Sequence, residues 1–158
     1  MKYSIDTSAI LEGWTRLYPP DVAPGLWEKL EELVAAGELI ATEEVLVELK
    51  KKEDDAAYKW AQRQRAMFKP IDANIQQAVA IILKNHTRLI EANRNRSSAD
   101  PFVIGLAQVE SCKVVTAERP SGSLNKPKIP DVCSALKVPW ISLMELCREQ
   151  KLVLVAKG

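Results

Sequence analysis

Histidine and cysteine are scarce in this chain and poorly spaced for metal or nucleophile chemistry. The sequence contains one histidine, His86, and three cysteines, Cys112, Cys133 and Cys147. One histidine cannot build a zinc site or a histidine-based triad on its own, and the sequence has no C-x-x-C pair. We therefore expect the cysteines to be reduced, buried thiols of a cytosolic protein.

Long apolar runs and a phosphate-binding loop are missing as well. No apolar run approaches the length of a membrane span, and the opening MKYSID is too short and too polar for a signal peptide. The segment PSGSLNKPK lacks Walker spacing, so ATP is not implied. The formal net charge of +1 gives no overall field that would attract a polyanion, so any nucleic-acid contact has to rest on local patches. We expect a cytoplasmic protein without a membrane span.

The chain does have the length and composition of one soluble domain. It contains 158 residues, of which 47% are apolar and 27% are charged. We place the domain at residues 1–150 and a tail, whose structure the pattern does not predict, at 151–158. Strands are predicted at 2–5, 38–42, 113–117 and 139–142, and helices at 8–14, 24–37, 43–52, 54–68, 72–86, 100–111, 131–136 and 143–150.

The order of these elements predicts the fold class. Strands alternate with helices, which is typical of an α/β protein. We expect a three-layer α/β/α sandwich with a central, mostly parallel sheet. Residues 118–130 are predicted as a long loop, and residues 87–99 as a loop or a frayed helix end. In such folds, functional sites form outside the carboxyl ends of the strands.

Four carboxylates are placed where such a site would form. Asp6 follows the first strand, Glu48 lies on the helix after the second, Asp100 opens an apolar helix, and Glu118 follows the strand KVVT. In a parallel sheet, Asp6 and Glu118 leave their strands at the same edge. A cluster of this kind repels itself unless a cation is present. Mg²⁺ and Mn²⁺ prefer carboxylate and water oxygens, so we predict a site for one of these ions.

Each of these residues also has an ordinary structural interpretation. Asp6 can cap the following helix, Glu48 can be a solvated residue of a charged helix, Asp100-Pro101 is a standard helix start, and Glu118 can be an ordinary loop residue. A fifth carboxylate, Asp131, is interpreted as a helix cap more readily than as a ligand. Supporting hydrogen bonds to the carboxylates, or ordinary cap and turn roles, are expected for Thr7, Ser8 and Thr116.

Basic residues gather in two stretches of the chain. One is the KKK run at 50–52, and the other includes Lys84, Arg88, Arg94 and Arg96 and leads into Asp100. Such runs are usually solvated charged faces. The second stretch can also hold an RNA backbone beside the acidic residues. The predicted RNA contacts are Arg94, Arg96 and, in the loop after Glu118, Lys126.

Five motifs occur in a consistent order along the chain: YSIDTSAI, VLVELKKKEDD, SSADPFVIGLA, VVTAERP and KIPDVC. In this ordered set the chain resembles the PIN-domain nucleases, the fold of the VapC-like toxin ribonucleases, and in particular the DUF4411-type branch of PIN-like proteins. The resemblance places the family's acidic residues at Asp6, Glu48, Asp100 and Glu118. The last position is more often aspartate in the wider fold, which leaves its role as a direct ligand less well supported.

The resemblance implies a metal-dependent endoribonuclease that hydrolyses RNA phosphodiester bonds with Mg²⁺ or Mn²⁺. It further implies the toxin of a toxin–antitoxin pair, a homodimer, and an antitoxin protein whose segment blocks the site. The alternative is a catalytically silent PIN-fold module that binds RNA or protein. Phosphoryl transfer through an aspartyl phosphate is disfavoured, since DTS lacks the second aspartate of haloacid-dehalogenase-like enzymes. A receiver domain is disfavoured because the late strand supplies no lysine.

Overall fold

A five-stranded parallel sheet forms the centre of the molecule. We describe it from a computed structural model, in which residues 1–52, 55–91 and 99–156 are described. The strands lie in the order β3-β2-β1-β4-β5, and every neighbouring pair is parallel. Their bounds are β1 Tyr3–Ile5, β2 Leu39–Thr42, β3 Phe68–Lys69, β4 Lys113–Val115 and β5 Trp140–Ile141.

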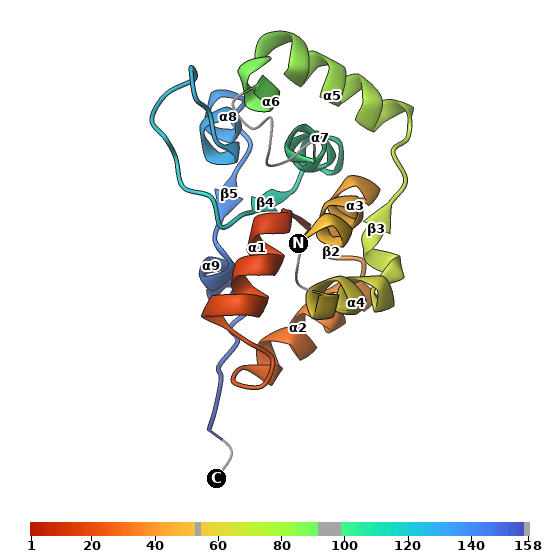
Figure 1. Ribbon diagram of the computed structural model, residues 1–158, viewed down its shortest axis with the longest axis vertical. Helices are drawn as coiled ribbons and strands as arrows, with labels where there is room; N and C mark the ends of the chain where they lie inside the picture. Colours follow the sequence, from red (N-terminus) through yellow and green to blue (C-terminus); the bar gives the residue numbers. More distant parts are fainter. Residues whose placement is uncertain (53–54, 92–98, 157–158) are drawn as a thin grey trace.

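Helices cover both faces of this sheet. In Figure 1 the strands run across the middle, with α5, α7 and α8 above them and α1, α2 and α9 below. This arrangement confirms the predicted three-layer α/β/α fold. The helices are α1 Thr7–Glu12, α2 Pro24–Ala35, α3 Glu43–Lys51, α4 Asp55–Arg63, α5 Ala73–Asn85, α6 Arg88–Glu91, α7 Asp100–Glu110, α8 Ile129–Ala135 and α9 Leu143–Glu149, with a π-helix η1 at Gly13–Leu17 and a 3-10 turn η2 at Arg65–Met67.

The predicted C-terminal end of one helix is wrong. The sequence pattern extends a helix over 54–68, whereas α4 ends at Arg63 and the chain then forms the edge strand β3 beside β2. Pro70 explains only the extended backbone of Lys69, because the residue before a proline is disfavoured in helical geometry. The end of α4 at Arg63 precedes the 3-10 turn η2, which leads into β3. A strand of two residues is too short to produce an alternating pattern in the sequence, so it was not foreseen.

The core on the lower face is built around three tryptophans. Trp27 packs edge-on against both Trp14 and Trp60, with ring centroids 4.8 Å and 4.9 Å apart. This cluster joins η1, α2 and α4, and it seats the helical segment that follows β1. Gly13 lets this segment approach α9, since a Cβ there would lie 2.8 Å from the side chain of Leu143.

All three cysteine thiols are free and buried, as predicted. Burial raises the pKa of Cys112 to about 11, and these thiols are therefore not activated nucleophiles.

Residues 152–156 form neither helix nor strand, and Leu152 packs against the core. In the part of the chain that the structure describes, no helix has the length and apolar character needed to span a bilayer.

Candidate active site

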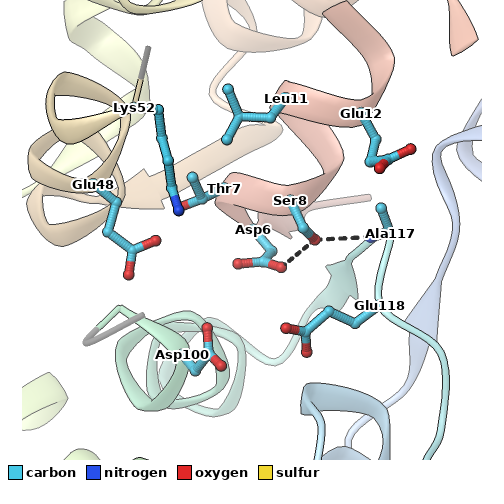
Figure 2. Close-up of a pocket in the computed structure, with 10 residues that line it drawn as sticks. All are labelled: Asp6, Thr7, Ser8, Leu11, Glu12, Glu48, Lys52, Asp100, Ala117 and Glu118. Atoms are coloured by element: carbon cyan, nitrogen blue, oxygen red, sulfur yellow. Dashed lines mark hydrogen bonds between the residues drawn. The ribbon is translucent and has the colours of Figure 1, made fainter. Parts of the chain in front are cut away.

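The structure brings the four predicted carboxylates to one cavity. Asp6, Glu48, Asp100 and Glu118 all line a cavity of about 380 Å³ at the carboxyl ends of β1 and β4. Figure 2 shows their side chains converging on this space from β1, α3, α7 and the segment after β4. Residues far apart in the chain therefore contribute to a single acidic pocket, which we call the acidic cavity.

Asp6 sits at the helix N-cap position but its side chain does not cap the helix. Its backbone is extended, at φ −88° and ψ 152°, and its carboxylate accepts no hydrogen bond from the backbone of α1. The carboxylate oxygen Oδ2 instead accepts hydrogen bonds from Ser8 Oγ and Thr116 Oγ1, at 2.5 Å and 3.0 Å. Asp6 is only 2% exposed. A carboxylate is thus buried at a strand end for a reason other than helix capping.

Burial and charge both act on the protonation of Asp6. Burial is the largest influence and the Glu118 carboxylate the next, and together they raise the pKa of Asp6 to about 7. The hydrogen bonds from Ser8 and Thr116 act in the opposite direction, and the charge of Glu48 adds a smaller increase. Near neutral pH this carboxylate is therefore stabilised by taking up either a proton or a cation.

Glu48 joins the acidic cavity to the start of α7. It is 5% exposed, and its Oε1 accepts a 2.8 Å hydrogen bond from the backbone N–H of Ala99. The interpretation of Glu48 as a solvated helix residue is therefore wrong. Asp100, which follows Ala99, is 1% exposed. The N-cap of α7 is Ala99, so Asp100 lies inside the first turn and not at the predicted cap position.

Hydroxyl groups connect the ends of β1 and β4. Ser8 Oγ lies 3.2 Å from Thr116 Oγ1 and accepts a 3.0 Å hydrogen bond from the N–H of Ala117. Thr116 Oγ1 accepts a bond of 3.1 Å from the N–H of Glu118, and the Glu118 Oε2 accepts one from the N–H of Ile129. Ser8 and Thr116 therefore hydrogen-bond the Asp6 carboxylate, as expected, and they also hold the backbone of the segment that follows β4.

Thr7 makes a different contribution to the acidic cavity. This residue lines the cavity and is 4% exposed, and its Oγ1 is buried without a hydrogen-bond partner among the described residues. A buried hydroxyl normally has a partner, since leaving it unpaired costs about 1–3 kcal/mol. The threonine hydroxyl thus has bonding capacity left for a group held in the cavity.

The donor set fits a hard divalent ion. In the described ranges, no three His, Cys, Asp or Glu side chains lie close enough together to hold a metal ion as they stand. Mg²⁺ does not require such a cage, because it keeps several waters and is commonly bound through one or two carboxylates. The acidic cavity offers carboxylates, the Thr7 hydroxyl and room for water. Asp6 and its neighbours would hold Mg²⁺ or Mn²⁺.

Asp131 lies outside the acidic cavity. Its carboxylate accepts hydrogen bonds from the backbone N–H groups of Lys128, Ser121 and Gly122. Burial opposes ionisation, but these hydrogen bonds outweigh it and lower the pKa of Asp131. Asp131 thus fixes the start of α8 and the preceding loop, as its interpretation as a cap predicts. The structure places Glu118, and not Asp131, among the cavity carboxylates.

Only one of the three predicted RNA contacts lies among the described residues. Lys126 is exposed on the loop between β4 and α8 and does not line the acidic cavity. Arg94 and Arg96 lie outside the described residues. The RNA-binding role of these side chains stays a prediction.

Two charged residues of the acidic cavity were not singled out from the sequence. Lys52 and Glu12 both line it. A helical spacing of four residues could have indicated them, because Lys52 follows Glu48 and Glu12 follows Ser8 at that interval. The KKK run obscured the first signal, since two of its three lysines do not line the cavity.

The fold and the cavity define a parallel α/β protein whose carboxylates gather where its two central strands end. The chain belongs to the family described as a domain of unknown function, DUF4411, whose model matches residues 3–154. No curated protein matches the sequence. The family description carries no activity, so the function has to be argued from the chemistry of the site.

Proposed function

We propose that the protein is a metal-dependent endoribonuclease that hydrolyses RNA phosphodiester bonds with Mg²⁺ or Mn²⁺. One observation carries the proposal: the four predicted carboxylates, three of them almost fully buried, line one cavity together with Glu12 at the carboxyl ends of neighbouring strands. Three buried acids cost stability unless the site serves a ligand that offsets their repulsion. The motif resemblance to PIN-domain nucleases supplies RNA as the substrate.

The proposed reaction joins a water oxygen to phosphorus while the bond to the leaving ribose oxygen breaks and that oxygen takes up a proton. A bound Mg²⁺ or Mn²⁺ would activate the water and neutralise charge on the phosphate. Within this chain, Asp6 would be oriented by Ser8 and Thr116, and Thr7 Oγ1 would accept or donate a hydrogen bond to a water in the cavity. Asp100, Glu48 and Glu118 would complete the anionic walls.

A groove beside the acidic cavity fits an extended, single-stranded substrate. The groove has a volume of about 510 Å³ and shares Glu12, Ala117 and Glu118 with the acidic cavity. Its other lining residues include Arg119 and the half-buried aromatic side chain of Trp140. Cations and aromatic rings are the groups that bind phosphates and bases of single strands. A polymer could therefore extend beyond the bond being cut.

A biological role follows from the same resemblance. We infer a cytoplasmic toxin of a toxin–antitoxin pair, with an antitoxin protein that blocks the acidic cavity and a homodimer as the active assembly. Light scattering of the purified protein would test the dimer. Co-expression with the product of the adjacent reading frame, followed by copurification, would test the antitoxin.

A catalytically silent PIN-like module that binds RNA or protein is the second candidate. The observation favouring it is that no preformed three-ligand metal group exists among the residues described. Such a module would bind RNA without divalent ions. Loss of the Asp6 charge would leave that binding intact or strengthen it, because one repulsive carboxylate would be gone.

A cleavage assay separates the two candidates. A mixed, labelled RNA pool would be incubated with Mn²⁺, Mg²⁺ or EDTA and with wild type, Asp6→Asn or Asp100→Asn. Glu43→Gln is the matched control, since Glu43 is exposed on α3 and does not line the acidic cavity. Cutting by wild type and Glu43→Gln alone, abolished by EDTA, supports the nuclease. Equal cutting by all variants indicates a contaminant, and absence of both cutting and metal binding overturns the proposal.

A further inference from the structure

Lys52 provides the positive charge that lines the acidic cavity. Among the described residues that line it, Lys52 is the only one with a cationic side chain. The residue follows the last turn of α3, four positions after Glu48. In Figure 2 its side chain extends from α3 toward Thr7, and its Nζ faces the space above Asp6 and Glu48. The ammonium group thus lies on the wall opposite Glu118.

The Lys52 ammonium is close to acids but paired with none of them. Other lysines of the described chain, Lys2 and Lys113, form ion pairs with Glu110 and Glu149. Lys52 forms no ion pair with any carboxylate in the ranges that the structure describes. Its charge is therefore available to an anion that enters the cavity.

A favourable interaction with the helix dipole does not account for the position of Lys52 at the acidic cavity. A lysine in the last turn of a helix interacts favourably with the helix dipole, and Lys50 and Lys51 of α3 already occupy that turn. Both are exposed and do not line the acidic cavity. Lys51 is thus a natural control, because it shares the helix end with Lys52 but not the pocket.

We propose that Lys52 binds a non-bridging oxygen of the substrate phosphate, an inference that rests on the proposed nuclease function. A phosphodiester carries a negative charge and must enter a cavity lined by five carboxylates. A bound divalent ion offsets part of this repulsion, and a free ammonium group beside Thr7 offsets more. Lysine binds phosphate as a point charge, which suits a long side chain on a cavity wall. Lys52 is therefore a positioning residue for the phosphate and not a metal ligand.

Measurements of RNA affinity test the proposed contact between Lys52 and the phosphate without requiring cleavage. Lys52→Met and Lys51→Met would each be placed in an Asp100→Asn background, and the affinity for a labelled single-stranded RNA would be measured at several salt concentrations. Each phosphate contact contributes about 0.7 to the slope of log affinity against log salt for single strands. We expect Lys52→Met to weaken binding and reduce that slope by about 0.7, whereas Lys51→Met leaves the slope unchanged.

Cleavage by the otherwise native enzyme gives the second readout. Loss of one charge-assisted contact predicts a decrease in kcat/KM of about tenfold to a hundredfold for Lys52→Met. Lys52→Arg should restore part of the rate, and the affinity for Mn²⁺ should not fall in either variant. If wild type cuts RNA while Lys52→Met matches Lys51→Met in rate and salt slope, the inference on Lys52 is overturned and the nuclease stands. If wild type neither cuts nor binds RNA, both proposals fail.

Discussion

The hydroxyl of Thr116 donates a 3.0 Å hydrogen bond to Oδ2 of Asp6, across a separation of 110 residues in the chain. The contact is possible because β1 and β4 are parallel neighbours, with Ile5 in register with Val115. It fixes one oxygen of the Asp6 carboxylate from the side of β4. No hydrogen bond from the described residues reaches the other oxygen, Oδ1, which remains available to a ligand in the acidic cavity.

Replacing Thr116 by valine should weaken metal binding without unfolding the protein. Valine keeps the shape of threonine but cannot donate to Asp6 or accept from the N–H of Glu118. Because the lost hydrogen bond holds the pKa of Asp6 down, the pKa should rise further and protons should compete better with the ion. Titration calorimetry with Mn²⁺ at pH 7 should show an affinity about tenfold lower, as expected for a net loss of about 1–1.5 kcal/mol. An unchanged affinity would show that Thr116 does not orient the ligand.

The stability of the metal-free protein should fall as pH rises toward neutrality. The Asp6 carboxyl has a pKa of about 7 when folded and 3.8 in an unfolded chain, so the folded state holds more protons between these values. The contribution from Asp6 is complete below about pH 4 and is lost by about pH 7, a change of up to roughly 4 kcal/mol. Denaturant unfolding of wild type and Asp6→Asn in EDTA would measure it.

Asp6→Asn should lack this part of the pH dependence and be the more stable protein at pH 7. Mg²⁺ should stabilise wild type at pH 7 and leave Asp6→Asn unaffected, because the ion binds the folded, ionised site. Parallel pH profiles for the two proteins would contradict the raised pKa of Asp6.

Glu118→Gln should shift the pH-dependent loss of stability to lower pH, whereas Thr116→Val should shift it to higher pH. The charge of Glu118 is the second largest cause of the raised pKa of Asp6, after burial. Removing that charge lowers the folded pKa of Asp6, so the loss of stability should end at a lower pH and be smaller in total. Glutamine can still accept the hydrogen bond from the N–H of Ile129, which preserves the start of α8. A shift in the same direction as Thr116→Val would show that Glu118 does not act on Asp6 through its charge.

Glu48 should affect stability through its hydrogen bond and chemistry through its charge. Glu48→Gln retains an oxygen that can accept from the N–H of Ala99, whereas Glu48→Ala leaves this buried donor without that partner. We expect alanine to reduce the free energy of unfolding by about 1–3 kcal/mol relative to glutamine. Both variants should lose metal-dependent activity. Equal stabilities of the two variants would show that the bond does not anchor α7.

Asp131 should be important for folding but not for metal binding. Its carboxylate holds three backbone N–H groups around the start of α8, so Asp131→Ala should cost about 1–2 kcal/mol in the free energy of unfolding. Its lowered pKa means that this contribution is present above its unfolded pKa and lost as pH falls through the acid range. Mn²⁺ affinity should stay within twofold of wild type. A large loss of affinity would make Asp131 a ligand after all.

The fold class could be predicted from sequence because each signal was local. Apolar strands such as KVV alternate with amphipathic helices, and this alternation alone predicts a parallel sheet. The convergence of Asp6 and Glu118 followed from the same rule, since parallel strands end at one edge. Strand β3 could not be predicted, because a strand of two residues is too short to show an alternation of apolar and polar side chains. Its place is decided by tertiary pairing with β2.

The details of the acidic cavity depended on contacts that no sequence pattern encodes. Glu48 looks like a solvated residue in sequence, since it lies within the charged helix α3, but the structure buries it against the start of α7. Lys52 has no sequence signal that separates it from Lys51, apart from its spacing from Glu48. Three-dimensional placement therefore distinguishes a cavity residue from a solvated one.

The order of β1 and β4 along the chain also determines when the cavity can assemble during synthesis. Asp6 is translated before Thr116, which follows it by 110 residues, and before Ala117 and Glu118. An amino-terminal fragment that stops before β4 lacks one wall of the cavity and the hydroxyl that orients Asp6. In the proposed nuclease, the acidic cavity would therefore be complete only after β4 and the segment that follows it have been translated.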